Sequence, residues 1–392
     1  MPSCCRGVTP RVIFTYHLIP LLLFQPTPIP ESNCSNMSPS SSKRTLSATC
    51  LCQNSTLTFT VSATSLPLPT HFCHCSICRH THGTLSTIHA PIPTPVVNFT
   101  TLTAYASSSR VVRYFCSTCG AHMLDRATEM EQEDGDGGEG QWYVAASLVD
   151  AEEVTWNLHS HMNLASTLDG GMSIWLEEIN GKKLGKWKGS IQAQWIETGD
   201  WVPAASTTIA SMKGPKDDDR LYAHCHCRGV EFYISRPGPN SFDHLPQSLT
   251  PKDKTKWYAS SDVCTSCRLC SSSFLTSWMF TSTASLRLPD GSPYKHVFGT
   301  TKVYESSPGV MRTFCGKCGA LVVYACVERS QMVDIGVGLL DTESGARAED
   351  WLEWRTHKVS FEEDAVWKGA VEALKEGLRR WGEGEGQEKV TV

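Results

Sequence analysis

The residues best suited to chemistry in this chain are its cysteines, because many of them lie in short clusters. Between residues 50 and 119 they follow the order C-x-C, C-x-C-x-x-C and C-x-x-C: Cys50, Cys52, Cys73, Cys75, Cys78, Cys116 and Cys119. A structural zinc takes four tetrahedral ligands, whereas a zinc that acts on a substrate has three protein ligands and one open position. The seven sulfurs therefore predict one closed site and one open site.

We assign the two outer pairs to the closed site, because each pair stands on a tight turn that directs both sulfurs at one ion. These pairs are Cys50 with Cys52 and Cys116 with Cys119. The middle group, Cys73, Cys75 and Cys78, is the open site and is named the first claw. Disulfide scaffolds are the alternative, but they are usually shorter than about 100 residues. Clustered cysteines in a chain of 392 residues favour metal.

The same landmarks return later in the chain, which indicates an internal duplication. Residues 225–227 repeat the C-x-C pair, and residues 312–318 repeat the Arg-x-Phe-Cys-x-x-Cys pattern of residues 113–119. A second closed site is therefore predicted from Cys225, Cys227, Cys315 and Cys318.

The second copy departs from the first at the claw. In one alignment Cys264 and Cys267 match the last two claw cysteines, and Asp262 stands in place of Cys73. In the other alignment Cys267 and Cys270 match them, and a threonine stands in place of Cys73. A carboxylate is a harder ligand than a thiolate, although zinc accepts both. A zinc at this second claw therefore depends on Asp262 or Cys270 as its third ligand.

The elements that position these cysteines are predicted to be strands. Both copies contain short segments rich in Thr, Val, Ile and aromatic residues, broken by Gly and Pro, which is typical of strands. The acidic, Gly-rich run 129–140 predicts a solvated loop. Apolar residues at helical spacing after Phe361 predict an amphipathic helix that packs on the second domain, or alternatively binds a partner.

The chain is therefore divided into a leader, two mainly β zinc domains, a linker and a C-terminal helix. The expected boundaries are 1–45 for the disordered leader, 46–181 for the first domain, 182–219 for the linker, 220–360 for the partly degenerate second domain and 361–392 for the helix and tail.

Composition narrows the classes of function. The formal net charge of −5 gives no electrostatic argument for nucleic acid, and no apolar run is long enough for a membrane helix. Residues 12–24 are apolar and follow two arginines, as in a secretory signal. Reduced thiolate–zinc sites do not suit an oxidising compartment, however. We therefore expect a cytoplasmic protein.

The ordered motifs resemble a known family. Cys50-Leu-Cys52, Cys73-His-Cys75-Ser-Ile-Cys78-Arg79 with Gly83, and Phe115-Cys116-Ser-Thr-Cys119-Gly120 are similar to those of the glutathione-dependent formaldehyde-activating enzymes and the centromere protein V domain. The resemblance covers nearly all of residues 46–182 and, more loosely, 221–358. It implies a mainly β fold akin to small Rab-binding chaperones. It also implies that the four outer cysteines hold a structural zinc and that the first claw holds a second zinc near the thiol of glutathione.

The resemblance implies a carbon–sulfur lyase that acts on adducts of glutathione with a small aldehyde, such as S-hydroxymethylglutathione. The cofactor would be Zn²⁺, glutathione would be the co-substrate, and the catalytic residues would be Cys73, Cys75, Cys78 and Arg79. Arg79 and Arg113 are candidates for the carboxylates of glutathione, because guanidinium pairs with carboxylate in a two-pronged geometry. An ion pair or a carbonyl bond beside the claw is the alternative for both. His74 is expected to turn away from the metal, and His80 and His82 are expected at the surface.

Two other functions compete with the lyase. A non-catalytic zinc scaffold for a protein or chromatin partner is favoured by the degenerate second claw. A thiol–disulfide redox protein is the weaker reading, because its C-x-x-C motif usually opens a helix in a βαβ unit, which this sequence does not predict.

Overall fold

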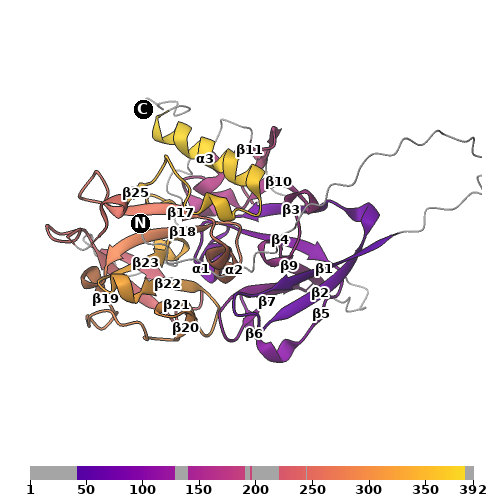
Figure 1. Ribbon diagram of the computed structural model, residues 1–392, viewed down its shortest axis with the longest axis horizontal. Coiled ribbons are helices and arrows are strands. Elements are labelled where there is room, and N and C mark those ends of the chain that lie inside the picture. The colour runs from indigo at the N-terminus through magenta and orange to yellow at the C-terminus, as the bar shows by residue number, and fades with distance from the viewer. Residues whose placement is uncertain (1–41, 129–139, 190–194, 197–219, 244, 385–392) are drawn as a thin grey trace, which may run out of the picture. The chain divides into compact units, whose positions relative to one another are not determined.

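The structure is a computed structural model that describes residues 42–128, 140–189, 195–196, 220–243 and 245–384 (Figure 1). The predicted leader up to residue 41, the acidic run 129–139, the linker residues 197–219 and the tail 385–392 lie outside the described residues. In the described part of the chain, no helix is both long and apolar enough to cross a membrane.

The first domain is built on a nine-stranded sheet with the order β14-β13-β10-β3-β4-β9-β8-β7-β6. Its strands are β3 (Leu68–Cys73), β4 (Thr87–Ile92), β6 (Leu102–Ala106), β7 (Val111–Cys116), β8 (His122–Ala127), β9 (Gln141–Ala145), β10 (Trp156–Met162), β13 (Gly185–Trp187) and β14 (Trp195–Ile196). Three further strands form a smaller sheet: β1 (Lys43–Thr49), β2 (Thr56–Ser62) and β5 (Val96–Val97). The larger sheet thus continues into the residues that the sequence predicted as linker.

The second domain repeats this plan with a seven-stranded and a four-stranded sheet. The larger sheet has the order β20-β21-β22-β23-β18-β17-β25: β17 (Trp257–Asp262), β18 (Thr276–Ser282), β20 (Thr301–Ser307), β21 (Val310–Cys315), β22 (Leu321–Cys326), β23 (Met332–Gly336) and β25 (Leu352–Trp354). The smaller contains β15 (Arg220–His224), β16 (Glu231–Ser235), β19 (Leu286–Arg287) and β24 (Leu340–Asp341). A short hairpin of β11 (Glu178–Ile179) and β12 (Lys182–Lys183) stands outside these sheets. The predicted mainly β architecture with two sheet-rich regions is confirmed.

Alternating polarity explains why these segments form strands. In β2, Leu57, Phe59 and Val61 are buried, while the threonines between them are exposed. Successive side chains of a strand point to opposite faces, so this pattern covers the core on one side and meets solvent on the other.

Each domain contains one short helix, which directly follows a strand that carries claw residues. Helix α1 (Ser76–His82) follows β3, and helix α2 (Thr265–Ser271) follows β17. In each helix a cysteine is the N-cap, Cys75 or Cys264, and its sulfur accepts a backbone N–H three residues later. Both helices end in a left-handed residue, which is Gly83 in α1 and Ser272 in α2.

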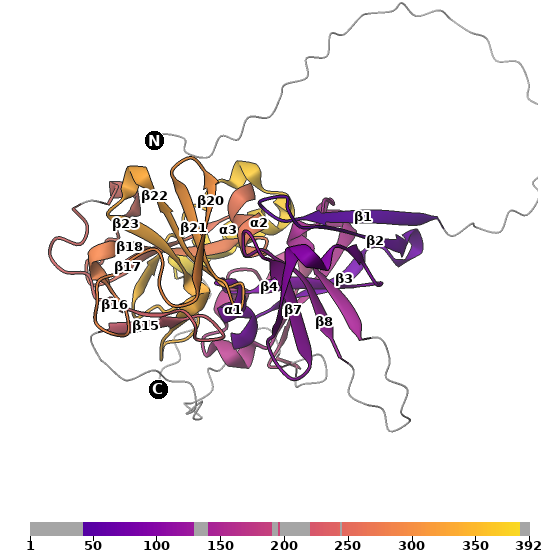
Figure 2. The same ribbon diagram turned by 90° about the horizontal axis from the view of Figure 1, so that it is seen from below.

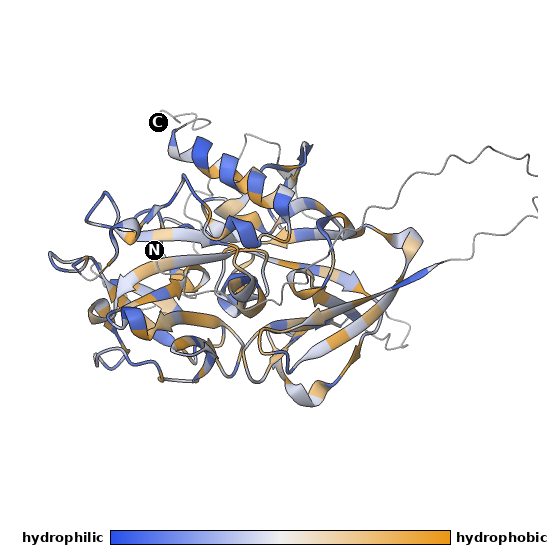
Figure 3. Cartoon of the chain, in the orientation of Figure 1, coloured by the Kyte–Doolittle hydropathy of each residue, from blue (hydrophilic) through white to orange (hydrophobic). Residues whose placement is uncertain are grey.

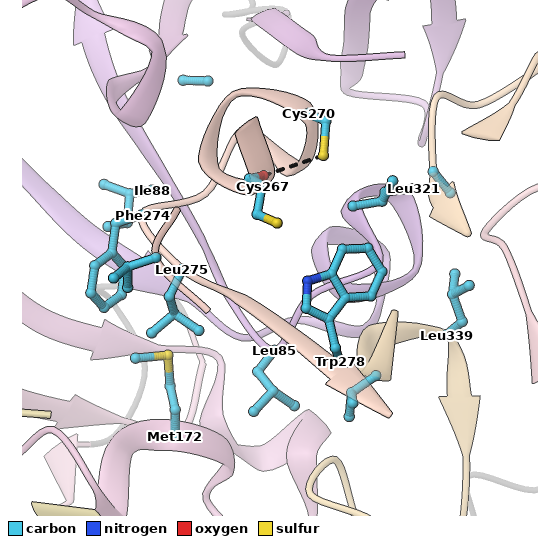
Figure 4. Close-up of a cluster of buried hydrophobic side chains, with 14 of the residues drawn as sticks. Leu85, Ile88, Met172, Cys267, Cys270, Phe274, Leu275, Trp278, Leu321 and Leu339 are labelled. Carbon is cyan, nitrogen blue, oxygen red and sulfur yellow. Dashed lines mark hydrogen bonds between the residues drawn. The ribbon is translucent and has the colours of Figure 1, made fainter. Parts of the chain in front are cut away.

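The two domains share one buried core. Figure 4 shows Leu85, Ile88 and Met172 of the first domain beside Phe274 and Leu275 of the second. All of these side chains are at most 3% exposed. Neither domain therefore encloses its own apolar face completely.

Glycines allow the backbones of the two domains to touch. The N–H of Gly338 donates to the carbonyl of Gly83 at 3.2 Å. A Cβ atom on Gly83 would overlap the carbonyl oxygen of Leu321, and one on Gly338 would overlap the backbone of Thr84. The contact is made from both sides, since α1 packs against the 3₁₀ turn Val337–Leu339 of the second domain, and α2 packs against the corresponding turn Ala146–Leu148 of the first. Figure 2 shows α1 and α2 where the strands of the two domains meet.

The C-terminal helix is present but packs differently from the prediction. Helix α3 (Lys368–Gly382) has a buried stripe and an exposed one, and Figure 3 shows hydrophobic and hydrophilic residues along it. The carboxylate of Glu153, in the first domain, accepts the N–H groups of Gly369 and Ala370 at 2.9 Å each. This carboxylate satisfies otherwise unpaired donors at the helix N-terminus.

The C-terminal end of α3 also lies on the first domain. The ring of Trp381 packs edge-on against Trp175, with 5.5 Å between ring centroids. The predicted packing on the second domain is also present, since the guanidinium of Arg347 lies over the ring of Trp381 and a Cβ atom on Gly382 would overlap Thr356. The contacts with the first domain were not predicted, and they arise because the shared core leaves apolar surface of that domain for α3 to cover.

We expect Gly377→Ala to destabilise the protein, although alanine is the better helix former by about 1 kcal/mol. A Cβ atom at this position would overlap the carbonyl of Trp175. Overpacking of this kind costs about 1–3 kcal/mol, which urea unfolding measures as a lower free energy of unfolding. Glu372→Ala, at an exposed position of the same helix, is the control and should change stability by less than about 0.5 kcal/mol. A more stable Gly377→Ala variant would contradict this packing.

Candidate metal centres

The first closed site brings four sulfurs from two distant turns together. The Sγ atoms of Cys50, Cys52, Cys116 and Cys119 all lie within 4.8 Å of one another. The Cys50–Cys52 and Cys52–Cys116 sulfur distances are both 3.5 Å, far longer than a disulfide bond of about 2.05 Å. Four Zn–S bonds of about 2.3 Å in a tetrahedron place sulfurs about 3.8 Å apart. The four residues fit a zinc ion.

Backbone turns hold these sulfurs in place. The N–H of Cys50 donates to the carbonyl of Ser55 at 3.1 Å, which closes the turn between β1 and β2. The N–H of Cys116 donates to the carbonyl of Ala121 at 2.8 Å, and Gly120 between them has a φ of 82°. A left-handed backbone of this kind favours glycine, which explains the Cys-Gly sequence after the second pair.

The second closed site has the same geometry. The sulfurs of Cys225, Cys227, Cys315 and Cys318 lie within 4.8 Å of one another, and Cys227 is 3.5 Å from both Cys225 and Cys315. This group fits zinc as the first one does. Both predicted sets of four cysteines are therefore assembled by the fold.

The second closed site also contacts the first domain. His226 stands between two of its cysteines, and its N–H donates to the carbonyl of His80 on α1 at 3.0 Å. Tyr105 of the first domain lies 2.7 Å from the Nδ1 atom of His226 through its hydroxyl. The turn that carries Cys225 and Cys227 is therefore hydrogen-bonded to α1, the helix that contains Cys78 of the first claw.

The first claw is assembled at the junction of β3 and α1. The sulfurs of Cys73, Cys75 and Cys78 lie within 4.8 Å of one another. The Nδ2 atom of Asn163 donates to Cys73 at 3.3 Å, and the Nη2 atom of Arg113 donates to Cys78 at 3.3 Å. Cys73 and Cys75 are partly exposed. Three thiolates with side-chain donors and partial access fit a zinc with an open position.

His74 turns away from the claw into a buried hydrogen-bond chain. Its Nε2 atom lies 2.8 Å from Nδ1 of His161, and Nε2 of His161 donates to the carbonyl of Leu176 at 2.7 Å. Burial lowers the pKa of His74 well below its ordinary value and lowers the pKa of His161 to about 3. Both imidazoles are therefore neutral and fix the backbone between two claw cysteines.

Both candidate arginines are buried beside the claw. Arg79 donates to the carbonyls of His74 and Ser166, at 3.3 and 3.1 Å. Arg113 donates to Asp125 at 2.9 Å as well as to the sulfur of Cys78. Their predicted contact with the carboxylates of a substrate stays a prediction.

The expectation that His80 and His82 lie at the surface is wrong. Both are buried, because α1 lies between the two domains. The ring of His80 stacks on His224 of the second domain at 4.2 Å, and the ring of His82 stacks on His122 at 4.1 Å. The sequence shows each repeat separately and does not show which faces of the repeats meet.

The second claw contains Asp262, Cys264 and Cys267, whose ligand atoms lie within 4.8 Å of one another. Cys270 lies outside this group among the described residues and donates its thiol to the carbonyl of Cys267 (Figure 4). Burial, with the nearby Cys267, raises the pKa of Asp262 well above its ordinary value. All three residues are buried, in contrast to the first claw.

Sequence reasoning missed the partners supplied by other strands. His161 and Asn163 belong to β10 and the residue that follows it, and β10 pairs in parallel with β3 about 90 residues earlier. Asp125 lies on β8, opposite Arg113. Such pairings leave no local motif, and only the polar residues at strand positions could have indicated them.

We expect the purified protein to contain two tightly bound zinc ions and a third that dissociates more readily. Cys116→Ser should unfold the first domain, since structural zinc contributes on the order of 10–16 kcal/mol in small modules. Cys75→Ser should retain the fold and lose the labile zinc. Elemental analysis and circular dichroism measure both effects, with Cys326→Ser, outside every cluster, as the control. Reduced, folded protein without zinc would contradict the assignment.

A comparison of the sequence with known protein families identifies the family that the cysteine motifs resemble. The family described as glutathione-dependent formaldehyde-activating enzyme matches residues 45–158 and 250–354. A search of curated proteins returned no match. A crystal structure of a Rhodobacter sphaeroides protein is similar over 34% of this chain and 99% of its own, with 17% identity and a TM-score of 0.23, and supports no argument here. Because the family matches span more than half of the chain, the protein belongs to the glutathione-dependent formaldehyde-activating enzyme family and carries two of its domains in tandem.

Proposed function

We propose that the first domain catalyses the reversible addition of glutathione to formaldehyde, and thus acts as a carbon–sulfur lyase in the cleaving direction. The observation that carries this proposal is the first claw, with three thiolate ligands and partly exposed Cys73 and Cys75. A zinc ion bound there would keep the sulfur of glutathione as a thiolate.

The reaction balances without a further reactant. The thiol of glutathione loses its proton, its sulfur forms a bond to the aldehyde carbon, and the electron pair of the C=O double bond moves to oxygen. That oxygen then receives one proton, which gives S-hydroxymethylglutathione. Cleavage reverses each step.

The chain's own residues orient the claw for this chemistry. Asn163 and Arg113 each donate to a claw sulfur, which fixes the direction of its lone pairs. Arg79 and Arg113 are proposed to contact the carboxylates of glutathione. A guanidinium has five N–H donors, and the bonds among the described residues use two of them in Arg79 and three in Arg113, so a carboxylate would not have to replace these bonds.

The second domain is proposed to have no glutathione site. One thiolate is replaced by Asp262, and all three claw residues are buried. This buried claw is also the observation that favours the alternative function, a zinc scaffold for a protein or chromatin partner. A cytoplasmic location is proposed because the described cysteines are unpaired, as expected in a reducing compartment.

Cys75 and Cys264 offer a matched pair of substitutions, since each is the N-cap of its claw helix. We expect Cys75→Ser in the full chain to abolish glutathione binding in calorimetry, and Cys264→Ser to leave it unchanged. The reverse order would place the substrate site in the second domain.

The rate of turnover distinguishes the proposed lyase from the alternative function, a non-catalytic zinc scaffold. Exchange NMR with isotopically labelled formaldehyde and glutathione measures the rate of adduct formation and cleavage. We expect the wild-type protein to accelerate this exchange and Cys75→Ser to reduce it to the uncatalysed rate. Binding of glutathione without acceleration would favour the scaffold.

A further inference from the structure

A pair of polar residues, His89 and Asp125, lies on the sheet of the first domain, close to the first claw. The Nε2 atom of His89, on β4, lies 3.6 Å from Oδ2 of Asp125 on β8, and each side chain is 10% exposed. Nε2 of His89 and Oδ1 of Asp125 are buried and have no hydrogen-bond partner among the described residues. Buried polar atoms of this kind call for an explanation, which can be strain, a bound water or ion, or a role in catalysis.

Strand register places His89 near the claw. Cys73 pairs with Thr87, and His71 pairs with His89 two residues further along the same strands. Side chains two residues apart share one face of a sheet and are separated by about 6.6 Å. His89 and Cys73 therefore project from the same face of the sheet. They are diagonal neighbours on adjacent strands, because His89 lies opposite His71, two residues before Cys73.

A chain of contacts links this pair to the claw sulfur. Asp125 accepts a hydrogen bond from Nη1 of Arg113, and Nη2 of the same guanidinium donates to Cys78. The carboxylate of Asp125 is thus held in place by the group that also touches a claw ligand. This carboxylate faces the imidazole of His89 at 3.6 Å, a distance at which it would form an ion pair with the protonated ring.

The second domain replaces this pair by two aromatic rings. Asp262 pairs with Thr276, and Ser260 pairs with Trp278, so Trp278 stands where His89 stands in the first domain. Arg312 pairs with Tyr324, so Tyr324 stands in place of Asp125. Trp278 is 3% exposed and lies 6.4 Å from Tyr324 between ring centroids.

The polar pair and the three-thiolate claw therefore occur together in one domain and are lost together in the other. If His89 served only the packing of the first domain, its replacement would not be expected to accompany the change in the claw. The coincidence points to a shared task.

We propose that His89, oriented by Asp125, transfers the proton in the reaction at the first claw. In the direction of addition, its imidazole accepts the proton of the glutathione thiol and returns it to the aldehyde oxygen as the carbon–sulfur bond forms. In the direction of cleavage, it takes the proton from the hydroxyl of the adduct and returns it to the departing sulfur. This inference rests on the proposed function.

Several charged or titratable groups face His89 from the neighbouring elements. His71 lies opposite on β3, Asp125 and Arg113 lie on β8 and β7, and the ring of His82 on α1 stands edge-on at 5.3 Å between centroids. Across β9 the residue paired with His89 is an alanine. Asp125 is the anion among these groups and stabilises an imidazolium as the proton arrives.

The test is His89→Gln in the full-length protein, with His89→Asn as a second replacement if glutamine disturbs the fold. We expect the zinc content and the affinity for glutathione to equal those of the wild type. The rate of adduct exchange should fall by about 10²–10⁴-fold, which is the usual contribution of a proton-transfer residue. His296→Gln, in a loop of the second domain, is the control and should retain the full rate.

Asp125 acts through His89 and is tested as a positioning residue. We expect Asp125→Asn to lower the exchange rate by a smaller factor and to shift its pH dependence, and Asp125→Glu to restore part of the rate. Zinc analysis of each variant separates this effect from loss of the contact between Arg113 and Cys78.

The outcomes distinguish the two proposals. A wild-type protein that accelerates exchange and a fully active His89→Gln variant would overturn the role of His89 alone. A wild-type protein that binds glutathione without accelerating exchange would overturn both proposals.

Discussion

The rest of this structure depends on the convergence of four sulfurs from two turns in each domain. Cys50 and Cys52 follow β1, while Cys116 and Cys119 follow β7, more than 60 residues later, and their sulfurs meet within 4.8 Å. Four sulfurs at this spacing fit a tetrahedral zinc, whose charge would offset the repulsion between thiolates. A zinc bound there would join the turn after β1, in the small sheet, to the end of β7, in the large one. The position of the first claw depends on this arrangement, because β3, which carries Cys73, and β7, which ends at Cys116, belong to the same sheet.

The two domains share one hydrophobic core and contact each other through their backbones. Gly83 contacts Gly338 backbone to backbone, and His80 accepts the N–H of His226 in the second closed site, so α1 is bonded to the second domain at two points. The second domain, although its claw is degenerate, therefore supports the helix from which Cys78 projects.

Much of the fold and of the metal sites could be predicted from sequence, because both rest on local patterns. Alternating residues such as Leu57 and Phe59 predict strands, and the spacing of the cysteines predicts their grouping. The placement of α3 and the burial of His80 could not be predicted, since both depend on which surfaces of the two repeats meet. The pair of His89 and Asp125 was equally invisible, because its members are 36 residues apart and meet only through sheet register.

The position of α3 has a consequence for biosynthesis. Trp175, in the first domain, is 1% exposed, and Gly377 near the end of the chain closes over its carbonyl. At about 5–20 residues per second, the ribosome needs roughly 10–40 s to synthesise the chain between the end of β13 and Gly377. During this time the first domain has left the ribosome with an apolar tryptophan still uncovered. The first domain is therefore made first, but its surface at Trp175 is covered only after residues 368–382 have been made.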